Sequence, residues 1–172
     1  MRLYRGKIPQ IAHECIAALV RDGDVEIEPT NLSESELDLV AIMEEYLRRD
    51  YAFRERVKDR MERRGIPYRE YSKVRQRMSD EMGHPVGDDV ERFLCRQFVE
   101  NMMISRFVEE VYEEDEVIYK KLIEVLRGHD VNEQEIREEA ASKIKNVRPG
   151  TMDWEIALQH AVREVKKRRG LL

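Results

Sequence analysis

The sequence predicts an all-α fold, a helical bundle of about seven or eight helices made from two similar helical units. Apolar residues recur at helical spacing through most of the chain. Residues that interrupt helices are scarce, with 8 glycines and 5 prolines among 172 residues. Charged residues, chiefly Glu, Arg and Lys, reach 39%. These three residue types are good helix formers, so composition and periodicity agree.

The first elements follow from spacing and end signals. An amphipathic helix is predicted over 8–22, ending at Gly23, and the alternation in Val25–Glu28 indicates a short extended segment. Ser33 followed by Glu36 has the capping-box pattern, so the next helix is expected to begin there. Its core-facing stripe would consist of Leu37, Val40, Ala41 and Leu47.

Two further helices complete the first unit. A very basic helix is predicted over 51–64 and another over 68–82, separated by the breaker residues of 65–67. The clearest break in the chain is 83–87, with two glycines and a proline. The boundary between the units is therefore placed here.

The predicted units span 1–84 and 85–172, and they are expected to pack as one compact domain. Between Asp88 and Arg127 there is no Gly or Pro, so this segment is either one helix or two, with the acidic run 113–116 as the bend. The segment is expected to be the most buried part of the protein. Its wide apolar face contains Phe93, Leu94, Phe98, Met102, Met103, Phe107, Val108 and Val111, and Met102-Met103 is alternatively an adaptable partner groove.

Caps position the remaining helices. Asp88 with Glu91, and Asn132 with Glu135, have the spacing of reciprocal helix caps. Thr151 opens the last helix. Each of these residues is expected to accept a hydrogen bond from a free backbone amide at its helix start.

An internal repeat relates the two units. Residues 61–71 align without a gap on 144–154, and each copy reads basic helix, Pro/Gly turn, aromatic residue, long charged helix and glycine. The halves are expected to pack about a pseudo-twofold axis. Trp154 is expected to be largely buried at their interface.

The C-terminal part resembles a known family. Val147–Trp154, followed by a charged helix ending at Gly170, is similar to the C-terminal signature of the bacterial family called domain of unknown function 507. That signature is a Gly-Ser/Thr-x-Glu/Asp-Trp turn before a basic helix, and Met1–Leu3 looks like the family's start. Tyr71 replaces the Trp in the first copy. The resemblance implies a helical bacterial protein in a two-copy version, and it carries over no activity and no functional residues.

Composition indicates the compartment and excludes several function classes. Cys15 and Cys95 lie among apolar neighbours and are interpreted as reduced core residues of a cytoplasmic protein. His13 and Glu14 interrupt the first apolar stretch, so no signal peptide is expected. The most apolar region, 93–112, contains Arg96, Glu100, Arg106 and Glu109, so no membrane association is expected either. The net charge of −5 does not favour a general nucleic-acid binder. High charge with few amides is typical of proteins from hot environments.

No catalytic, cofactor-binding or metal site is predicted, and no small-molecule ligand is evident. No serine lies in a nucleophile motif, and no Gly-rich phosphate loop is present. Among metal patterns only Glu81-x-x-His84 has ligand spacing, and it falls in a chain break. The protein is therefore expected not to be an enzyme. The remote alternative is a carboxylate cleft containing Glu44, Glu45, Glu109 and Glu110.

Charge is segregated along the chain. Residues 22–45 contain nine acids and no base, whereas 48–77 contain twelve bases and five acids. Residues 88–117 contain ten acids and three bases, and 163–169 contain five bases and one acid. The first interpretation is an interaction module whose complementary charged helix faces pair with each other, with a protein partner or with a second copy.

The alternative interpretation is an RNA- or ribosome-associated protein with an exposed basic face on 48–77 and the C-terminal helix. Aromatic residues beside the first basic stretch are able to stack on bases, and they are equally ordinary packing residues. They are Tyr46, Tyr51, Phe53, Tyr68 and Tyr71. The candidate face for nucleic acid or an acidic partner consists of Arg56, Arg60, Arg63, Arg64, Lys166, Lys167, Arg168 and Arg169.

Overall fold

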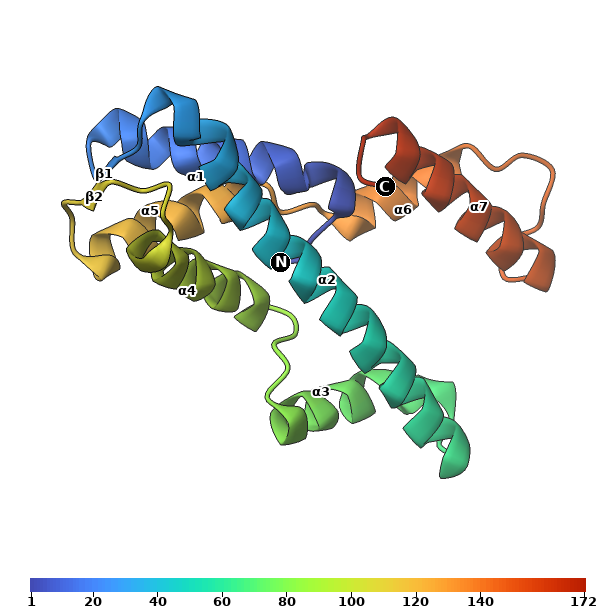
Figure 1. Cartoon of the computed structure of the whole chain (residues 1–172). Coiled ribbons are helices and arrows are strands. Elements are labelled where there is room, and N and C mark those ends of the chain that lie inside the picture. The colour runs from blue at the N-terminus through green and yellow to red at the C-terminus, as the bar shows by residue number, and fades with distance from the viewer.

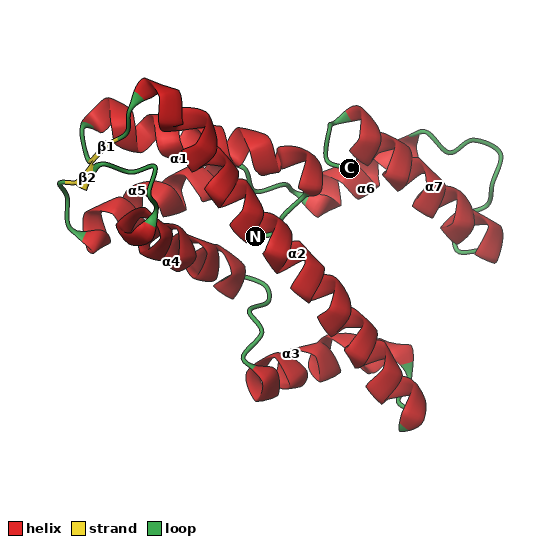
Figure 2. Ribbon diagram, viewed as in Figure 1, coloured by secondary structure: helices red, strands yellow, loops and turns green.

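A computed structural model describes residues 1–172 and is helical almost throughout, which confirms the all-α prediction (Figures 1 and 2). The two strands are each two residues long. The elements are α1 (Ile8–Asp22), β1 (Val25–Glu26), α2 (Leu32–Arg63), α3 (Tyr71–Met82), α4 (Asp89–Ile104), β2 (Glu110–Val111), α5 (Asp115–Gly128), α6 (Glu133–Ser142) and α7 (Met152–Arg168). Short 3-10 turns occupy Arg5–Lys7, Pro29–Asn31 and Tyr68–Glu70.

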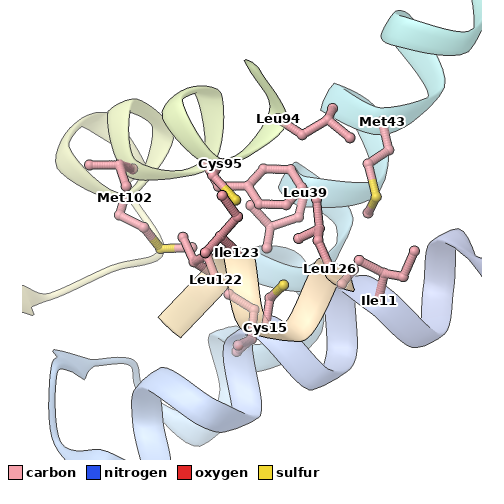
Figure 3. Packing of buried hydrophobic residues seen from close by; sticks show 14 of the residues in the cluster. Ile11, Cys15, Leu39, Met43, Leu94, Cys95, Met102, Leu122, Ile123 and Leu126 are labelled. Carbon is pink, nitrogen blue, oxygen red and sulfur yellow. The ribbon is translucent and has the colours of Figure 1, made fainter. Parts of the chain in front are cut away.

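The main core lies among α1, the N-terminal half of α2, α4 and α5, so both predicted units contribute to it. Figure 3 shows side chains from these helices meeting, with Cys15 and Cys95 among them. Both cysteines are fully buried, which confirms their interpretation as core residues. Burial raises the pKa of the Cys95 thiol to about 12 and also raises that of Cys15, so both thiols stay protonated and unreactive.

A two-stranded ribbon closes one end of this core. β1 pairs antiparallel with β2, Val25 opposite Val111 and Glu26 opposite Glu110. The extended segment predicted at 25–28 is therefore present at its first two residues. The ribbon also settles the open alternative for 88–127, because β2 separates two helices there.

Two helical hairpins extend from the core (Figure 1). The C-terminal half of α2 packs on α3, and α6 packs on α7. Each hairpin has its own small apolar cluster. The α2–α3 cluster contains Phe53, Val57, Met61, Met78 and Val86, and the α6–α7 cluster contains Tyr4, Ile136, Ala140, Leu158, Val165 and Leu171.

The N-terminal segment joins the α6–α7 hairpin to the rest of the molecule. Leu3 belongs to the main core, whereas the next residue, Tyr4, belongs to the α6–α7 cluster. Gly6 lies against the C-terminal turn so closely that a Cβ atom there would be 2.1 Å from the carbonyl oxygen of Gly170. Only glycine allows this approach of the two chain ends.

The prediction of separate helices before and after residue 50 was wrong, because α2 is continuous over 32 residues. No Gly or Pro lies inside that span, so nothing interrupts its backbone hydrogen bonds. The capping-box prediction at Ser33 was also wrong, since the N-cap is Asn31, without a side-chain hydrogen bond. The predicted stripe was misplaced: Leu37 is 55% exposed, while Leu39 and Met43 are buried.

The other cap predictions had mixed outcomes. Asn132 accepts hydrogen bonds from the amides of Gln134 and Glu135, and Thr151 accepts one from the amide of Trp154, as predicted. Asp88 precedes α4 in a helical conformation and makes no side-chain cap, so that prediction was wrong.

Trp154 lies at the first turn of α7 with most of its surface covered, as expected, and its predicted place at an interface between the two units stays a prediction. The buried face of α7 lies further along the helix, at Leu158 and Val165. None of the helices combines the length and the apolar character needed to cross a lipid bilayer.

Candidate functional site

A cleft lies where the middle of α2, the start of α3, the N-terminal segment and the C-terminal end of α7 approach one another. Its volume is about 710 Å³. We call it the cationic cleft, after its basic side chains, which are Arg2, Arg5, Arg54, Lys58, Arg75 and Lys166. Five tyrosines also line it, Tyr4, Tyr46, Tyr51, Tyr68 and Tyr71, together with the carboxylates Asp50 and Glu55.

Helix α2 supplies one wall of the cationic cleft. Tyr46, Asp50, Arg54 and Lys58 follow one another at intervals of four, so helical geometry places them along one face. Tyr46 and Asp50 are buried, whereas Lys58 is exposed. The wall thus runs from the core outward along the α2–α3 hairpin.

Asp50 organises the arginines of the cleft. Its carboxylate is almost buried and lies 3.0 Å from Nε of Arg54 and 3.7 Å from the nearest guanidinium nitrogen of Arg75. Nε2 of His84 lies 3.3 Å from the same carboxylate. A buried carboxylate needs such partners, and in return it fixes the directions of both guanidinium groups.

His84 holds the chain break between α3 and α4 against α2. Its ring stacks parallel to Tyr46, with centroids 5.7 Å apart, and lies 4.4 Å from the ring of Phe53. The Tyr46 hydroxyl donates to the carbonyl of Pro85 at 3.2 Å. Burial lowers the pKa of His84, and the hydrogen bond to Asp50 opposes that shift in part. Burial also raises the pKa of Tyr46, so its hydroxyl remains a neutral donor.

Tyr4 lies between two cations. The guanidinium carbon of Arg2 is 5.4 Å from its ring centroid, and Nζ of Lys166 is 5.2 Å from it. The side chain is buried and its hydroxyl has no hydrogen-bond partner within the protein. The Nε of Arg75 is likewise buried and unpartnered. Buried polar groups are normally paired, so these two donors are exceptions beside the cleft.

The cationic cleft carries a surplus of positive charge. Arg54 and Arg75 share Asp50, Arg2 and Lys166 share Glu133, and Lys58 pairs with Glu55. Arg5 has no ion pair. Six cations therefore share three carboxylates, and the cleft attracts anions.

Two tyrosines of the cleft are largely open to solvent. Tyr51 on α2 is 64% exposed and Tyr68 before α3 is 79% exposed. Tyr68 stacks on Tyr71 with ring centroids 5.5 Å apart. The cleft thus presents flat apolar rings beside its cations.

The arginines that the sequence singled out on α2 lie outside the cationic cleft. They surround a shallow hollow of about 400 Å³ with Met78 and Met82 of α3. Some of their charge is paired inside the hairpin, at 2.6 Å between Arg60 and Glu81 and at 2.9 Å between Arg63 and Asp59. Arg56 and Arg64 have no ion pair and are exposed.

The C-terminal cations mostly pair within their own hairpin. Lys167 lies 3.2 Å from Glu164, Arg169 lies 2.5 Å from Glu139, and Arg168 also contacts Glu139. Lys166 is buried and is the member of this group that reaches the cationic cleft. The structure thus brings Lys166, and not the α2 arginines, to the cleft.

The metal-ligand pattern and the carboxylate cleft considered in the sequence are not assembled into sites by the fold. His84 binds Asp50 while Glu81 pairs with Arg60, and no group of three or more His, Cys, Asp or Glu side chains is arranged to hold a metal ion. The four acids of the proposed carboxylate cleft divide between two elements. Glu44 and Glu45 lie on α2, where Glu45 pairs with Arg49, whereas Glu109 and Glu110 lie at β2.

Sequence reasoning missed the contribution of the N-terminal segment. Arg2 and Arg5 are visible in the sequence as basic residues, but nothing there places them beside α2 and α7. The contact depends on Gly6 and on the burial of Tyr4, which become meaningful only in the fold.

Comparison with known protein families gives a match over nearly the whole chain. No curated protein is similar to the chain. One family model matches residues 1–171, and the family is described as "Protein of unknown function (DUF507)". This confirms the resemblance that was based on Val147–Trp154. Since the match covers nearly the whole sequence, the chain belongs to the DUF507 family.

Proposed function

We propose that this protein is a non-enzymatic helical interaction module of the bacterial cytoplasm, which takes an anionic partner in the cationic cleft. The observation that carries the proposal is the excess of cations in that cleft, where six basic side chains share three carboxylates. Preorganised arginines beside exposed tyrosines suit recognition rather than catalysis.

The ion pairs elsewhere support assigning the partner to this cleft. Part of the charge of the α2 tip and most of the basic charge at the end of α7 are paired within their own hairpins, as in Arg60–Glu81 and Arg169–Glu139. Such surface pairs contribute only about 0–1 kcal/mol each to stability. They also leave the paired side chains with less net charge to attract a partner. Arg5 has no such pair and faces the cleft.

The experiment is a tagged pull-down from the source cytoplasm, with and without nuclease. The test variant Arg5→Glu/Lys58→Glu reverses two cleft charges. The control variant Arg96→Glu/Lys120→Glu reverses two charges outside the cleft, and its residues match in pairing: Arg96, like Arg5, has no ion pair, and Lys120, like Lys58, pairs locally. Partners should be lost with the test variant and retained with the control.

Equal recovery of all partners by both variants would contradict the proposal. Recovery of a second, untagged copy of the chain would identify self-association as part of the function. Conversion of a bound small molecule by the purified protein would favour an enzyme instead.

We also propose that the chain is a two-copy version of the family's unit, as its internal repeat suggests. The order helix, strand, helix occurs in α1–β1–α2 and again in α4–β2–α5, and the two strands pair antiparallel. In the second copy, α5 and α6 would correspond to an interrupted α2, and α7 to α3. Superposition of the halves by a rotation far from 180° would refute the pseudo-twofold relation.

A further inference from the structure

We infer that the cationic cleft binds single-stranded nucleic acid, with phosphates on its arginines and lysines and bases stacked on Tyr51 and Tyr68. This inference rests on the proposed binding function and specifies the class of partner. It also relocates the nucleic-acid surface, from the arginines at the tip of α2 to the cleft between the hairpins.

The exposed rings are the first reason. Tyr51 and Tyr68 expose 64% and 79% of their surface beside a cationic wall. Tyr68 is already stacked on Tyr71, so its ring is held in one orientation. Aromatic side chains of this kind are what single strands stack on, whatever their sequence.

The fixed arginines are the second reason. Asp50 holds Arg54 and Arg75 in place, so little freedom is lost when either guanidinium binds a phosphate oxygen. Arg5 adds a cation without a partner, and the cleft surplus draws in a polyanion.

The buried donors are the third reason. The hydroxyl of Tyr4 and the Nε of Arg75 are both buried without partners, and both residues line the cleft. Phosphate and sugar oxygens accept hydrogen bonds from such groups. Both atoms are covered by the protein, so they would donate to such oxygens only if the cleft widened on binding.

The same features disfavour the other anionic partners. A duplex keeps its bases stacked on one another and cannot place them on Tyr51 and Tyr68. The carboxylates of an acidic peptide would pair with the cations and would leave the two tyrosine rings uncovered. The acidic stretch at residues 22–45 repels phosphates from the N-terminal half of α2, which favours binding beside its basic half.

The test is fluorescence anisotropy of the full chain with labelled oligouridylate and oligothymidylate about 12 nucleotides long, over a range of salt concentrations. Both oligonucleotides should bind, and the logarithm of the binding constant should fall linearly with the logarithm of the salt concentration. Equal affinities would indicate stacking and phosphate contacts alone, whereas tighter oligouridylate binding would indicate contacts to the ribose hydroxyl. A duplex of the same length should bind at least tenfold more weakly.

Variants separate stacking from charge. Tyr51→Ala/Tyr68→Ala should weaken binding at least tenfold and leave the salt slope unchanged. Arg5→Gln should reduce the salt slope by about one. The controls are Tyr112→Ala, which removes a ring that is 62% exposed outside the cleft, and Arg96→Gln, and both should bind like the unaltered protein.

Absence of binding at low salt, or unaltered binding by the tyrosine variant, would overturn the inference. If the pull-down partners still depend on Arg5 and Lys58 in that case, the interaction module stands and its partner is an acidic protein. If that dependence is also absent, the proposed function fails as well.

Discussion

His84 shows how one side chain connects the cleft to the fold. Its ring is held between Tyr46 and Phe53, and its Nε2 faces the carboxylate of Asp50. The charged groups around it are Asp50 and the guanidinium groups of Arg49 and Arg75. Asp50 also pairs with Arg54 and Arg75, so a proton on His84 would compete with these two arginines for the same carboxylate.

Stability should fall in mild acid because of His84. Burial lowers its pKa below the ordinary 6.5, so the unfolded chain takes up this proton at a higher pH than the native protein does. The free energy of unfolding should therefore be fully retained above pH 6.5 and decline below it, until the pH passes the pKa of the folded state. Urea unfolding at pH 7.5 and at successively lower pH measures this decline.

The variant His84→Gln keeps a hydrogen-bonding group and cannot titrate. Its unfolding free energy should decline less between pH 7 and 5 than that of the unaltered protein. His13, which is exposed and pairs with Glu36, supplies the control variant His13→Gln. Equal declines in all three proteins would show that His84 does not contribute.

Among the elements, α2 determines how the charges are distributed. Its 32 residues span about 48 Å at 1.5 Å per residue, enough to pass through the core and extend beyond it. The apolar face of its acidic N-terminal half packs in the main core, and its basic C-terminal half forms the hairpin with α3. Glu34 in the first turn and Arg63 in the last also suit the helix dipole. A break at residue 50 would have placed the acidic half and the basic half on two separate helices.

The caps of α6 and α2 should differ in their contribution to stability. Asn132 accepts two backbone hydrogen bonds at the start of α6, so Asn132→Ala should lower the free energy of unfolding by about 1 kcal/mol. Ser33 is exposed within α2 and caps nothing, so Ser33→Ala should be neutral within about 0.5 kcal/mol. Urea unfolding of both variants makes the comparison, and equal effects would contradict the cap geometry.

These elements also show how far local sequence patterns reach. The caps at Asn132 and Thr151 were predicted because their partners lie within three residues. The identical pattern at Ser33 failed because the preceding turn continues directly into the helix, which begins at Leu32. The exposed side of Leu37 was not foreseen, since which face of a helix is buried depends on its neighbours in space.

At the scale of the whole molecule, the α6–α7 hairpin is attached mainly through the N-terminal segment. Leu3 and Tyr4 enter two different apolar clusters, and Gly6 contacts Gly170. This attachment also forms one side of the cationic cleft, with Arg2, Arg5 and Lys166. Docking of the hairpin and integrity of the cleft should therefore be lost together.

Gly6→Ala should undock the hairpin, because a Cβ atom at 2.1 Å from the Gly170 carbonyl oxygen forces the backbones apart. Hydrogen exchange of the amides in α6 and α7 should increase at least tenfold, while that of α1 and α5 stays unchanged. Gly128→Ala is the control, because its Cβ atom would meet no atom within 4 Å. Unchanged exchange in Gly6→Ala would show that the chain ends do not hold the hairpin.

By itself the sequence determined the all-α class, the burial of Cys15 and Cys95, the caps at Asn132 and Thr151, and the family. These properties depend on residue type and on neighbours within a few positions, where helix geometry is regular. Only the tertiary structure decided the site. Arg5, Tyr51 and Lys166 are far apart in the chain, and they meet because Gly6 lets the two chain ends approach and because α2 continues unbroken past the core. Long-range packing of this kind leaves no periodic signal in the sequence. The sequence therefore drew attention to the clustered arginines of the α2 tip and gave no indication of the cleft.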